Sequence, residues 1–266
     1  MPTAKTKRPD CYAKHPFHCR ILFLMMEHPP VEDISENFVT ILVPARNEQD
    51  HIALFLDEVT SACEDLKLTY ELLVIESGSS DKTVGTVQNF VARDSRIRLV
   101  RVAEPGYGIA LLRGLETARG KYIVIFNVDF WDKRFLYLSM VDNLEYDIVN
   151  GSKLLPGSTD SRTIYRKIVS RIFNWFFLRA LLGYNGTDTH GIKTLRAETV
   201  LPIARNCVTN SDIFDTELMV RSQRARLKML ELPVTVQEIR PTRFSGKRIL
   251  RIPMDIMRLF QILKKS

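Results

Sequence analysis

A single carboxylate closes one of the most apolar predicted strands of the chain. Asp129 follows the apolar run at residues 121–126 and stands in the triplet Asn127-Val128-Asp129. An acid at the point where a buried strand leaves a sheet is a natural ligand for a hard divalent cation, because such ions prefer oxygen donors. Two acids flanking one residue would be a strong metal signal, but here the first is an amide. The triplet predicts a metal site of reduced charge, with Asp129 as the charged ligand and Asn127 as a neutral one.

Two other predicted strands end in polar segments that suit a nucleotide. The first, Pro-Ala-Arg-Asn-Glu at 44–48, places Arg46 and Glu48 where they could contact a nucleotide, although an ordinary strand-to-helix connection would carry the same residues. The second, Glu-Ser-Gly-Ser-Ser-Asp-Lys-Thr at 76–83, exposes backbone N–H groups in its turn. Glu76 could accept hydrogen bonds from a base or ribose, and a capped turn without a ligand is the alternative.

The elements that must position these strand ends follow a strand–helix alternation. Apolar runs predict strands at 39–43, 72–75, 97–102 and 122–126, and helical patterns lie between them at 48–66, 81–91 and 109–118. This spacing predicts a doubly wound α/β fold with a mainly parallel sheet and helices on both faces. Ligands then bind beyond the carboxyl ends of the strands, where Asn47, Glu76 and Asp129 all fall.

The second half of the chain is less regular. Strands are predicted at 148–152, 190–195 and 229–237, and helices at 163–182, 212–226 and 247–265, the last interrupted by Pro253. We expect an N-terminal appendage over residues 1–36, a main domain over 37–245 and a basic amphipathic tail over 246–266. This division follows the point at which regular hydrophobic patterning begins and ends.

Composition narrows the range of partners and compartments. The 266 residues are 45% hydrophobic and carry a net charge of +7, which suits an anionic partner. The four cysteines are scattered, which favours a reducing compartment. No apolar run reaches the length of a spanning helix, and the basic N-terminus lacks the apolar core of a secretory signal. Nucleic acid is disfavoured as a partner, because the basic residues follow amphipathic helices and not a known reader motif.

Four motifs in order resemble those of the family 2 glycosyltransferases of GT-A fold. They are P-A-R-N-E, E-S-G-S-S-D-K-T, P-G-Y-G-I-A-L-L-R-G-L-E-T-A-R-G-K-Y-I and N-V-D. The second half is similar to the polyprenyl-phosphate (dolichol-phosphate) hexosyltransferases of that family. The similarity rests on Gly-Ser-Lys at 151–153, Arg166 and Ser170, Thr-Asp-Thr-His-Gly at 187–191, Phe-Asp-Thr-Glu-Leu at 214–218, Glu-Leu-Pro-Val at 231–234 and Arg-Pro-Thr-Arg-Phe-Ser at 240–245.

The resemblance implies an inverting transfer of a hexose from a GDP- or UDP-sugar to a polyprenyl phosphate, assisted by Mg²⁺ or Mn²⁺. It implies donor or nucleotide contacts at Pro44, Arg46, Glu48, Glu76, Ser77, Gly78, Asp81, Gly108, Asn127, Asp188, His190, Arg240, Arg243 and Lys247. It implies acceptor-phosphate contacts at Lys153, Arg166 and Ser170, catalytic roles for Asp129 and Asp215, and metal ligation by Asp129 and Asn127.

Two alternatives stay open at this point. A transferase to a glycan hydroxyl would need Asp215 or Asp188 as a general base, whereas a lipid phosphate is already an anion and needs none. A catalytically silent nucleotide-sugar-binding relative is the other alternative, because Asn127 replaces the first acid of the usual D-x-D string.

Three further departures from the family pattern bear on the site. Glu76 and Ser77 replace a pair of aspartates, which changes the predicted base contacts. Trp131 stands where these enzymes often carry a glutamine near the metal. Lys153 replaces a common arginine, so the charge is kept while the two-pronged phosphate contact is lost.

Two basic amphipathic helices suggest a membrane surface. The helix at 163–182 combines isoleucines and aromatics with several arginines, which fits either a core helix with a solvated basic face or a helix in the headgroup layer. The helix at 247–265 has the same character. We therefore expect a cytoplasmic enzyme attached peripherally to the cytoplasmic face of a membrane.

Overall fold

The structure, a computed structural model, describes residues 38–142, 145–160, 164–236 and 246–265. The chain divides into two units, Met1–Asp33 and Ile34–Ser266, and the described residues all belong to the second. The predicted appendage at 1–36 lies outside the described residues, as do Arg240 and Arg243. The predicted boundaries at 36 and 245 stay predictions.

Within the described ranges, seven strands form one sheet in the order β3-β2-β1-β4-β7-β5-β8. The strands are β1 (Phe38–Ala45), β2 (Thr69–Glu76), β3 (Ile97–Arg101), β4 (Tyr122–Ile125), β5 (Ile148–Ser152), β7 (Lys193–Arg196) and β8 (Met229–Pro233). Neighbours pair in parallel except at β7, which is antiparallel to both β4 and β5. A short parallel pair, β6 (Thr159–Asp160) and β9 (Thr235–Val236), stands apart. The predicted mainly parallel α/β fold is confirmed.

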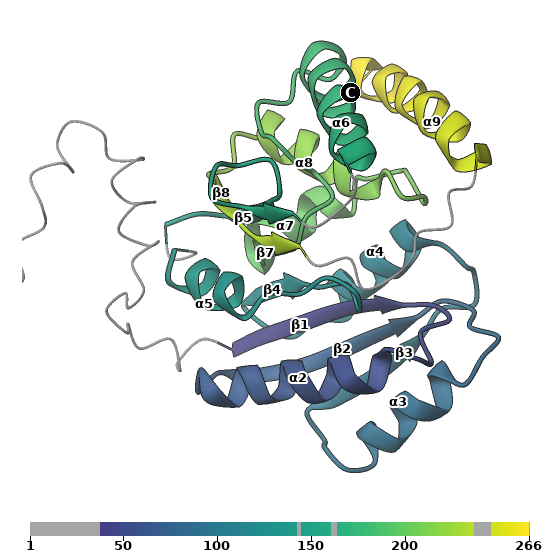
Figure 1. Cartoon of the computed structure of the whole chain (residues 1–266), viewed down its shortest axis with the longest axis vertical. Helices are drawn as coiled ribbons and strands as arrows, with labels where there is room; N and C mark the ends of the chain where they lie inside the picture. The colour runs from purple at the N-terminus through teal and green to yellow at the C-terminus, as the bar shows by residue number, and fades with distance from the viewer. Residues whose placement is uncertain (1–37, 143–144, 161–163, 237–245, 266) are drawn as a thin grey trace, which may run out of the picture. The chain divides into compact units, whose positions relative to one another are not determined.

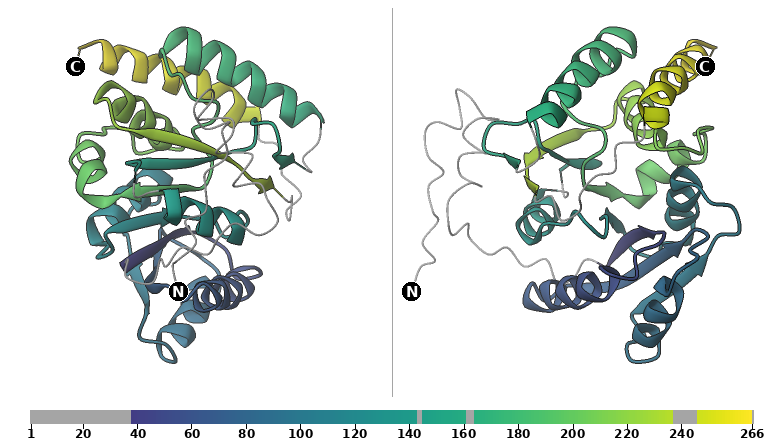
Figure 2. Two further views of the ribbon diagram at one scale, coloured as in Figure 1. Left: turned by 90° about the vertical axis from the view of Figure 1, so that its left-hand side faces the viewer. Right: turned by 45° about the vertical axis from the view of Figure 1, so that its right-hand side comes forward.

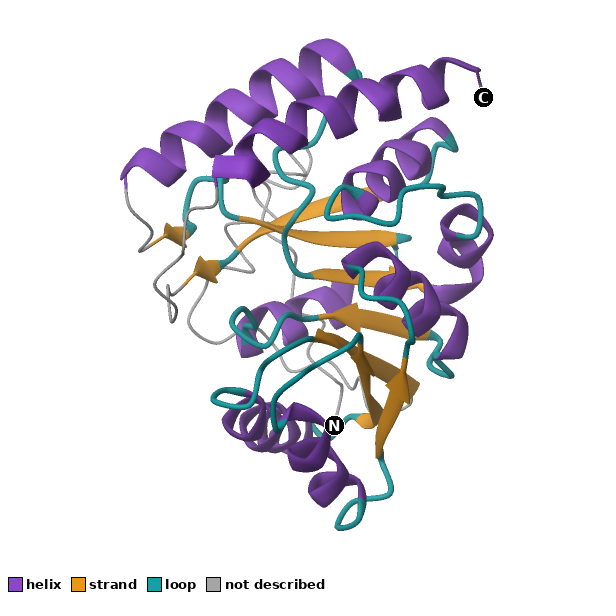
Figure 3. Ribbon diagram, turned by 90° about the vertical axis from the view of Figure 1, so that its right-hand side faces the viewer, coloured by secondary structure: helices purple, strands orange, loops and turns teal. Residues whose placement is uncertain are grey.

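Helices cover both faces of this sheet (Figure 1, Figure 3). On one face α2 (Ile52–Asp65) packs against α3 (Thr83–Val91), and on the other α4 (Tyr107–Thr117), α7 (Ala197–Ala204) and α8 (Phe214–Arg224) contact one another. Further along the chain, α5 (Lys133–Asp142) packs on β5, β7 and β8, α6 (Ile164–Ile172) continues into the π-helix η2 (Phe173–Leu181), and α9 (Gly246–Lys265) ends the chain.

The glycines of the third motif explain how closely α4 approaches the sheet. A Cβ at Gly114 would overlap the side chains of Leu42 and Ile75, and one at Gly120 would overlap the backbone of β1 at Thr40. A helix can lie this close to strands only where it presents hydrogen in place of a side chain. The motif therefore fixes the distance between α4 and the strands that carry the first two polar segments.

Several boundaries differ from the sequence prediction. The C-terminal helix is not interrupted at Pro253, and its Ile256, Leu259 and Leu263 are buried in the core with α8 and η2. Tertiary packing thus overrides the poor helix propensity of proline. The helix expected at 163–182 is α-helical only to Ile172, and the strand expected at 229–237 divides into β8 and β9. Helices α5 and α7 were not predicted. No helix in the described ranges is long and apolar enough to cross a membrane.

Candidate active site

The first two polar segments form one continuous surface at the ends of β1 and β2. These strands end in register, with Ala45 opposite Glu76. Beyond them, the backbone N–H of Asn47 donates to the Ser79 hydroxyl at 3.0 Å. The side-chain oxygen Oδ1 of Asn47 accepts a hydrogen bond from the Ser80 N–H at 2.9 Å. The Glu48 N–H donates to the Thr83 hydroxyl at 2.7 Å. Residues about 35 positions apart are therefore joined at the sheet edge where ligands of such folds bind.

Asp81 fastens this surface to the start of α3. Its carboxylate accepts hydrogen bonds from the Thr83 N–H at 2.9 Å, the Thr83 hydroxyl at 2.5 Å and the Gln49 N–H at 3.2 Å. Burial raises the pKa of Asp81, but the hydrogen bonds from Thr83 and Gln49 together outweigh this effect and lower the pKa below its usual value. The carboxylate is ionised at neutral pH and engaged in holding two loops together, so any nucleotide contact would coexist with these bonds.

Glu76 is buried at the end of β2 and bends back onto its own turn. It accepts a hydrogen bond from the Ser79 N–H and forms an ion pair with Arg101 of β3, at 3.3 Å from Nε to Oε2. Gly78 has a φ of 74°, a left-handed conformation that glycine adopts without strain and that allows this tight turn. Arg101 was missed in the sequence, because nothing in its strand marks it as a partner of an acid 25 residues earlier.

Asp129 lies at the tip of a tight turn. Asn127 and Phe130 close the turn with reciprocal backbone hydrogen bonds of 3.1 and 2.9 Å, so Val128 and Asp129 form its tip. Burial raises the pKa of Tyr107 well above its usual value. The negative charge of Asp215 raises it further, and the charges of Asp212 and Asp129 make smaller contributions in the same direction. The charges of three carboxylates from two distant parts of the chain therefore act on Tyr107, the first residue of α4.

The residues at this turn fit a divalent ion that is shared with a substrate. In the described ranges, no group of three or more His, Cys, Asp or Glu side chains is placed to hold a metal without help. Mg²⁺ commonly uses only one or two protein carboxylates and takes its other ligands from phosphates and water. Asp129 with Asn127 matches that pattern. Trp131 directs its indole N–H to Glu58 of α2 at 3.3 Å, so its polar atom is used away from the turn.

A buried ion pair lies below Tyr107. Asp215, in the first turn of α8, is 3.0 Å from the ammonium of Lys193 on β7 and accepts a hydrogen bond from the Tyr107 hydroxyl at 2.8 Å. Lys193 is 0% exposed and also donates to the Gly191 carbonyl at 2.7 Å. Asp215 was predicted to be catalytic, and the geometry shows a carboxylate engaged by an ammonium and a hydroxyl. Lys193 and Tyr107 were missed, because their link to Asp215 exists only in the folded chain.

The loop after η2 brings Asp188 and His190 toward the same region. The Asp188 carboxylate accepts from the His190 N–H at 3.0 Å and lies 3.4 Å from the Lys153 ammonium. Burial opposes ionisation of Asp188, but Lys153 and the His190 hydrogen bond hold its pKa below the usual range. Burial also lowers the pKa of His190, despite the nearby charges of Asp215 and Asp188. The imidazole is therefore neutral at pH 7.

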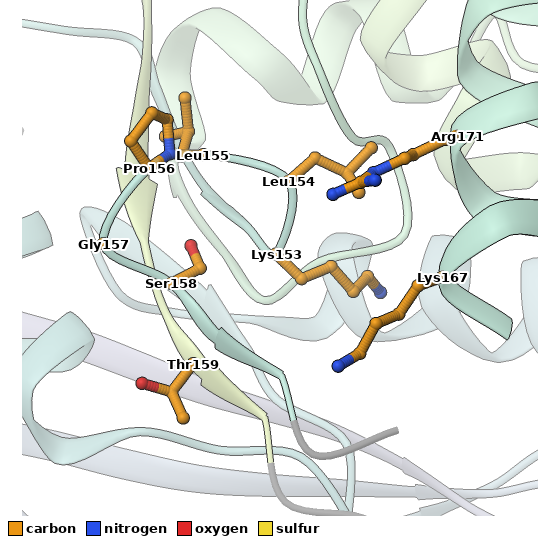
Figure 4. A pocket seen from close by; sticks show the side chains of 9 residues that line it. All are labelled: Lys153, Leu154, Leu155, Pro156, Gly157, Ser158, Thr159, Lys167 and Arg171. Atoms are coloured by element: carbon orange, nitrogen blue, oxygen red, sulfur yellow. The ribbon is translucent and has the colours of Figure 1, made fainter. Parts of the chain in front are cut away.

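Lys153 connects this loop with the Asp129 turn. Its ammonium lies 5.7 Å from the centroid of the Phe130 ring, next to Asp129, in a cation–π contact. It also lines a cavity of about 600 Å³ (Figure 4). The cavity is bounded by Lys153, Leu154, Leu155, Pro156, Gly157, Ser158, Thr159, Lys167 and Arg171. Figure 4 shows the side chains of Lys153 and Lys167 extending into the same region, the first from the loop after β5 and the second from α6.

The three residues predicted to contact the acceptor phosphate differ in their relation to this cavity. Lys153 lines it, Ser170 is half-buried on α6, and Arg166 lies on α6 with a side chain outside the described set. Lys167 and Arg171, each one position further along the helix, supply the other two cations. Sequence reasoning missed them because the face that α6 turns toward the β5–β6 loop depends on tertiary packing.

Other predicted donor contacts are more peripheral or structural. A Cβ at Gly108 would overlap Phe214 and the backbone before α8, so this glycine allows α4 to pack closely. Pro44 is half-buried near the end of β1, Arg46 is exposed, and Ser77 is buried after β2. Lys247 lies in the first turn of α9, with a side chain outside the described set.

Comparison with known proteins defines the class. The sequence model described as Glycosyl transferase family 2 matches residues 40–200, more than half of the chain. The chain belongs to this family, and the predicted assignment as a glycosyltransferase is confirmed.

Named relatives refine the comparison. The chain is 28% identical over 249 residues to "Dolichyl-phosphate beta-glucosyltransferase ALG5C" of Trichomonas vaginalis, covering 87% of this chain and 73% of that protein. It is 27% identical to "Dolichyl-phosphate beta-glucosyltransferase" of Dictyostelium discoideum, covering 86% and 75%. It is 30% identical to "Glycosyltransferase AglD" of Haloferax volcanii, but spans only 36% of that protein and 80% of this chain.

Solved structures confirm the GT-A fold. Glucosyl-3-phosphoglycerate synthase from Mycobacterium tuberculosis, in complex with Mn²⁺, uridine diphosphate and phosphoglyceric acid, superposes with a TM-score of 0.65 at 17% identity, covering 88% of this chain and 83% of that one. Mannosyl-3-phosphoglycerate synthase from Rubrobacter xylanophilus gives a TM-score of 0.59 at 18% identity, covering 84% and 73%.

Proposed function

We propose that the chain transfers a hexose, with inversion, from a nucleoside-diphosphate sugar to a polyprenyl phosphate at a membrane surface. The observation that carries the proposal is the position of Lys153. Its ammonium lies 5.7 Å from the Phe130 ring, beside Asp129, and it also lines the cationic cavity. A donor diphosphate at the Asp129 turn and an acceptor phosphate in the cavity would therefore be neighbours.

The donor half follows from the strand ends. The loops after β1 and β2 offer the exposed side chain of Arg46 to a nucleotide, which we propose to be UDP or GDP. Asp129 and Asn127 would hold Mg²⁺ or Mn²⁺ together with the diphosphate. The bound ion would neutralise the negative charge that develops on the leaving diphosphate. The Mycobacterium synthase that shares the fold was crystallised with Mn²⁺ and uridine diphosphate, which supports this choice.

The acceptor half favours a phosphate over a hydroxyl. Three cations, Lys153, Lys167 and Arg171, line the cavity, and each can donate charge-assisted hydrogen bonds to phosphate oxygens. A phosphate is already anionic, so it can attack the anomeric carbon without a general base. The carboxylates that a hydroxyl acceptor would need as a base, Asp215 and Asp188, are each paired with a lysine.

A single in-line displacement inverts the anomeric carbon. The acceptor phosphate oxygen forms the new bond to that carbon while the bond to the donor diphosphate breaks, and the diphosphate leaves with the electron pair. The lysines and arginine of the cavity hold the acceptor on one side, and the Asp129 turn holds the donor on the other. The relatives named as dolichyl-phosphate glucosyltransferases support this acceptor class.

The membrane part of the proposal rests on an exposed apolar stripe along α6 and η2. Its members are Ile164, Ile168, Ile172, Trp175 and Phe176, and Trp175 is 68% exposed. Helix α9 adds the exposed Met254 and Met257, and α6 and α9 lie side by side (Figure 2, Figure 3). Other residues of the same helices, Leu178 of η2 and Ile256, Leu259 and Leu263 of α9, are buried in the core. Aromatics in the headgroup layer, with Arg171 and Arg179 on the same helical rod, suit an anionic cytoplasmic leaflet.

A transfer assay tests the proposed reaction. The protein is incubated with labelled UDP- and GDP-hexoses, Mg²⁺ or Mn²⁺ and a short polyprenyl phosphate, and the lipid phase is counted. We expect labelled lipid that disappears with EDTA and in Asp129→Ala, while Asp65→Ala, an exposed acid of α2, retains activity. Binding or hydrolysis of the donor without lipid product would overturn the proposal. Transfer to an added glycan hydroxyl in place of the lipid would do the same.

A further inference from the structure

One carboxylate on the edge strand β8 has no part in the site as described so far. Glu231 pairs in register with Asn150 of β5. Its carboxylate accepts hydrogen bonds from the Thr187 N–H at 2.8 and 3.0 Å, from the Thr187 hydroxyl at 2.8 Å and from the Asp188 N–H at 3.2 Å. The Asn150 side-chain amide donates to it at 3.4 Å. One side chain thus holds two consecutive residues of the loop that follows η2.

Side-chain hydrogen bonds hold much of that loop in place, and Glu231 accepts several of them. Residues 183–192 form no helix or strand, so side-chain bonds take the role that a backbone ladder has elsewhere. Besides Glu231, the Asn150 amide donates to the Asp188 carbonyl at 2.8 Å, and the hydroxyls of Ser152 and Thr187 lie 2.6 Å apart. Strands β5 and β8 together therefore fix the position of the loop.

The chemistry of this contact requires a carboxylate. Several donors from Thr187, Asp188 and Asn150 converge on the two oxygens of Glu231. An ionised carboxylate only accepts, whereas the amide of glutamine would direct N–H groups at one of these donors. Burial raises the pKa of Glu231, and the hydrogen bonds from Thr187 and Asp188 oppose that effect. A group that is costly to bury is retained where its geometry is needed.

The loop that Glu231 holds in place is linked to the cationic cavity by one ion pair, between Asp188 and Lys153. The backbone that it fixes carries the Asp188 carboxylate, which lies 3.4 Å from the Lys153 ammonium. Lys153 lines the cavity with Lys167 and Arg171. A shift of the loop would therefore change where Lys153 presents its charge.

We propose that Glu231 is a positioning residue for the acceptor cavity. By fixing the backbone of Thr187 and Asp188, it places Asp188 against Lys153 and so sets the affinity for the acceptor phosphate. The inference rests on the proposed function, which makes a phosphate the ligand of the cavity. The effect concerns the acceptor, because the carboxylate of Asp188, although predicted as a donor contact, is paired with Lys153 of the cavity and accepts from the His190 N–H. The predicted nucleotide contacts Glu76 and Asp81 lie at the end of β2 and after it, on a different part of the sheet.

The test compares Glu231→Gln with wild type in the lipid-transfer assay. We expect the KM for polyprenyl phosphate to rise about tenfold, the factor for loss of one charge-assisted hydrogen bond. The KM for the nucleotide sugar and the urea midpoint of unfolding should change little. Thr187→Val removes one donor and keeps the backbone bonds, so it should raise the same KM by a smaller factor. Glu198→Gln, on the exposed side of α7, is the matched control and should behave as wild type.

The possible results separate this inference from the proposed function. If wild type makes no glycolipid, the proposed function fails. If wild type is active but Glu231→Gln leaves the acceptor KM unchanged, the positioning role is wrong. It is equally wrong if both KM values and the unfolding midpoint change together, because that pattern describes a general loss of structure.

Discussion

Replacement of Lys193 by methionine is expected to destabilise the fold strongly. The ammonium of Lys193 is 0% exposed and lies 3.0 Å from Asp215, whose side chain is 2% exposed. Methionine keeps much of the volume and removes the charge, which leaves a buried carboxylate with the Tyr107 hydroxyl as its partner. Breaking a buried pair in this way costs about 3–5 kcal/mol, a large part of the roughly 5–15 kcal/mol that holds a typical domain together.

The assay is urea unfolding at neutral pH, followed by far-ultraviolet circular dichroism. With a urea dependence of about 2–3 kcal/mol per molar for a chain of this size, the midpoint should fall by about 1–2 M. The double variant Lys193→Met with Asp215→Asn removes both charges and keeps an acceptor for Tyr107. It should therefore be more stable than Lys193→Met alone, although it carries one more substitution.

A surface pair provides the control. Lys133 and Asp65 lie 2.7 Å apart with both side chains about half exposed, so Lys133→Met should change the free energy of unfolding by less than about 1 kcal/mol. If Lys193→Met is no more destabilising than Lys133→Met, the ion pair does not have the role described here. A double variant that loses as much stability as the two single variants added together would show that Lys193 and Asp215 do not interact energetically.

Three further outcomes are expected. Because burial lowers the pKa of His190 in the folded state, the unfolded chain binds more protons below about pH 6.5, so the urea midpoint should fall as the pH is lowered from about 7.5 to 5.5. His190→Gln should flatten this profile and His51→Gln should not, and equal profiles for all three proteins would contradict the assignment. Asn127→Asp should tighten Mn²⁺ binding about tenfold in calorimetric titrations with nucleoside diphosphate present, and unchanged affinity would remove Asn127 from the metal site. Trp175→Ser should reduce sedimentation with anionic liposomes severalfold, whereas Leu54→Ser, an equally exposed substitution on α2, should not, and equal losses would refute the membrane-facing stripe.

The strands of the first half of the chain were predicted well from the sequence for a physical reason. Strands β1, β2 and β4 are buried almost throughout, so their apolar runs are unbroken and their ends are easy to place. Parallel pairing brings the carboxyl ends of these strands to one edge of the sheet. Asn47 and Ser80, two polar residues that follow strands, meet at this edge. The contacts of individual residues with a nucleotide or metal stay predictions.

The contacts that involve the second half of the chain were harder to predict because they are not local. Tyr107 and Asp215 are 108 residues apart, and no periodicity in either segment indicates that they touch. Two cations of the cavity, Lys167 and Arg171, lie on α6. The orientation of α6 depends on packing in the η2 segment that continues it, where Leu178 is buried in the core. The continuation of α9 through Pro253 likewise depends on buried residues further along the helix.

The cavity lined by Lys153, next to the Asp129 turn, is proposed to receive the acceptor phosphate. The most direct measurement is the KM for polyprenyl phosphate in the double variant Lys167→Gln with Arg171→Gln, compared with the KM for the nucleotide sugar. Loss of two charged contacts to phosphate should raise the acceptor KM about a hundredfold and leave the donor KM within about twofold. An unchanged acceptor KM, or an equal rise in both values, would contradict the account.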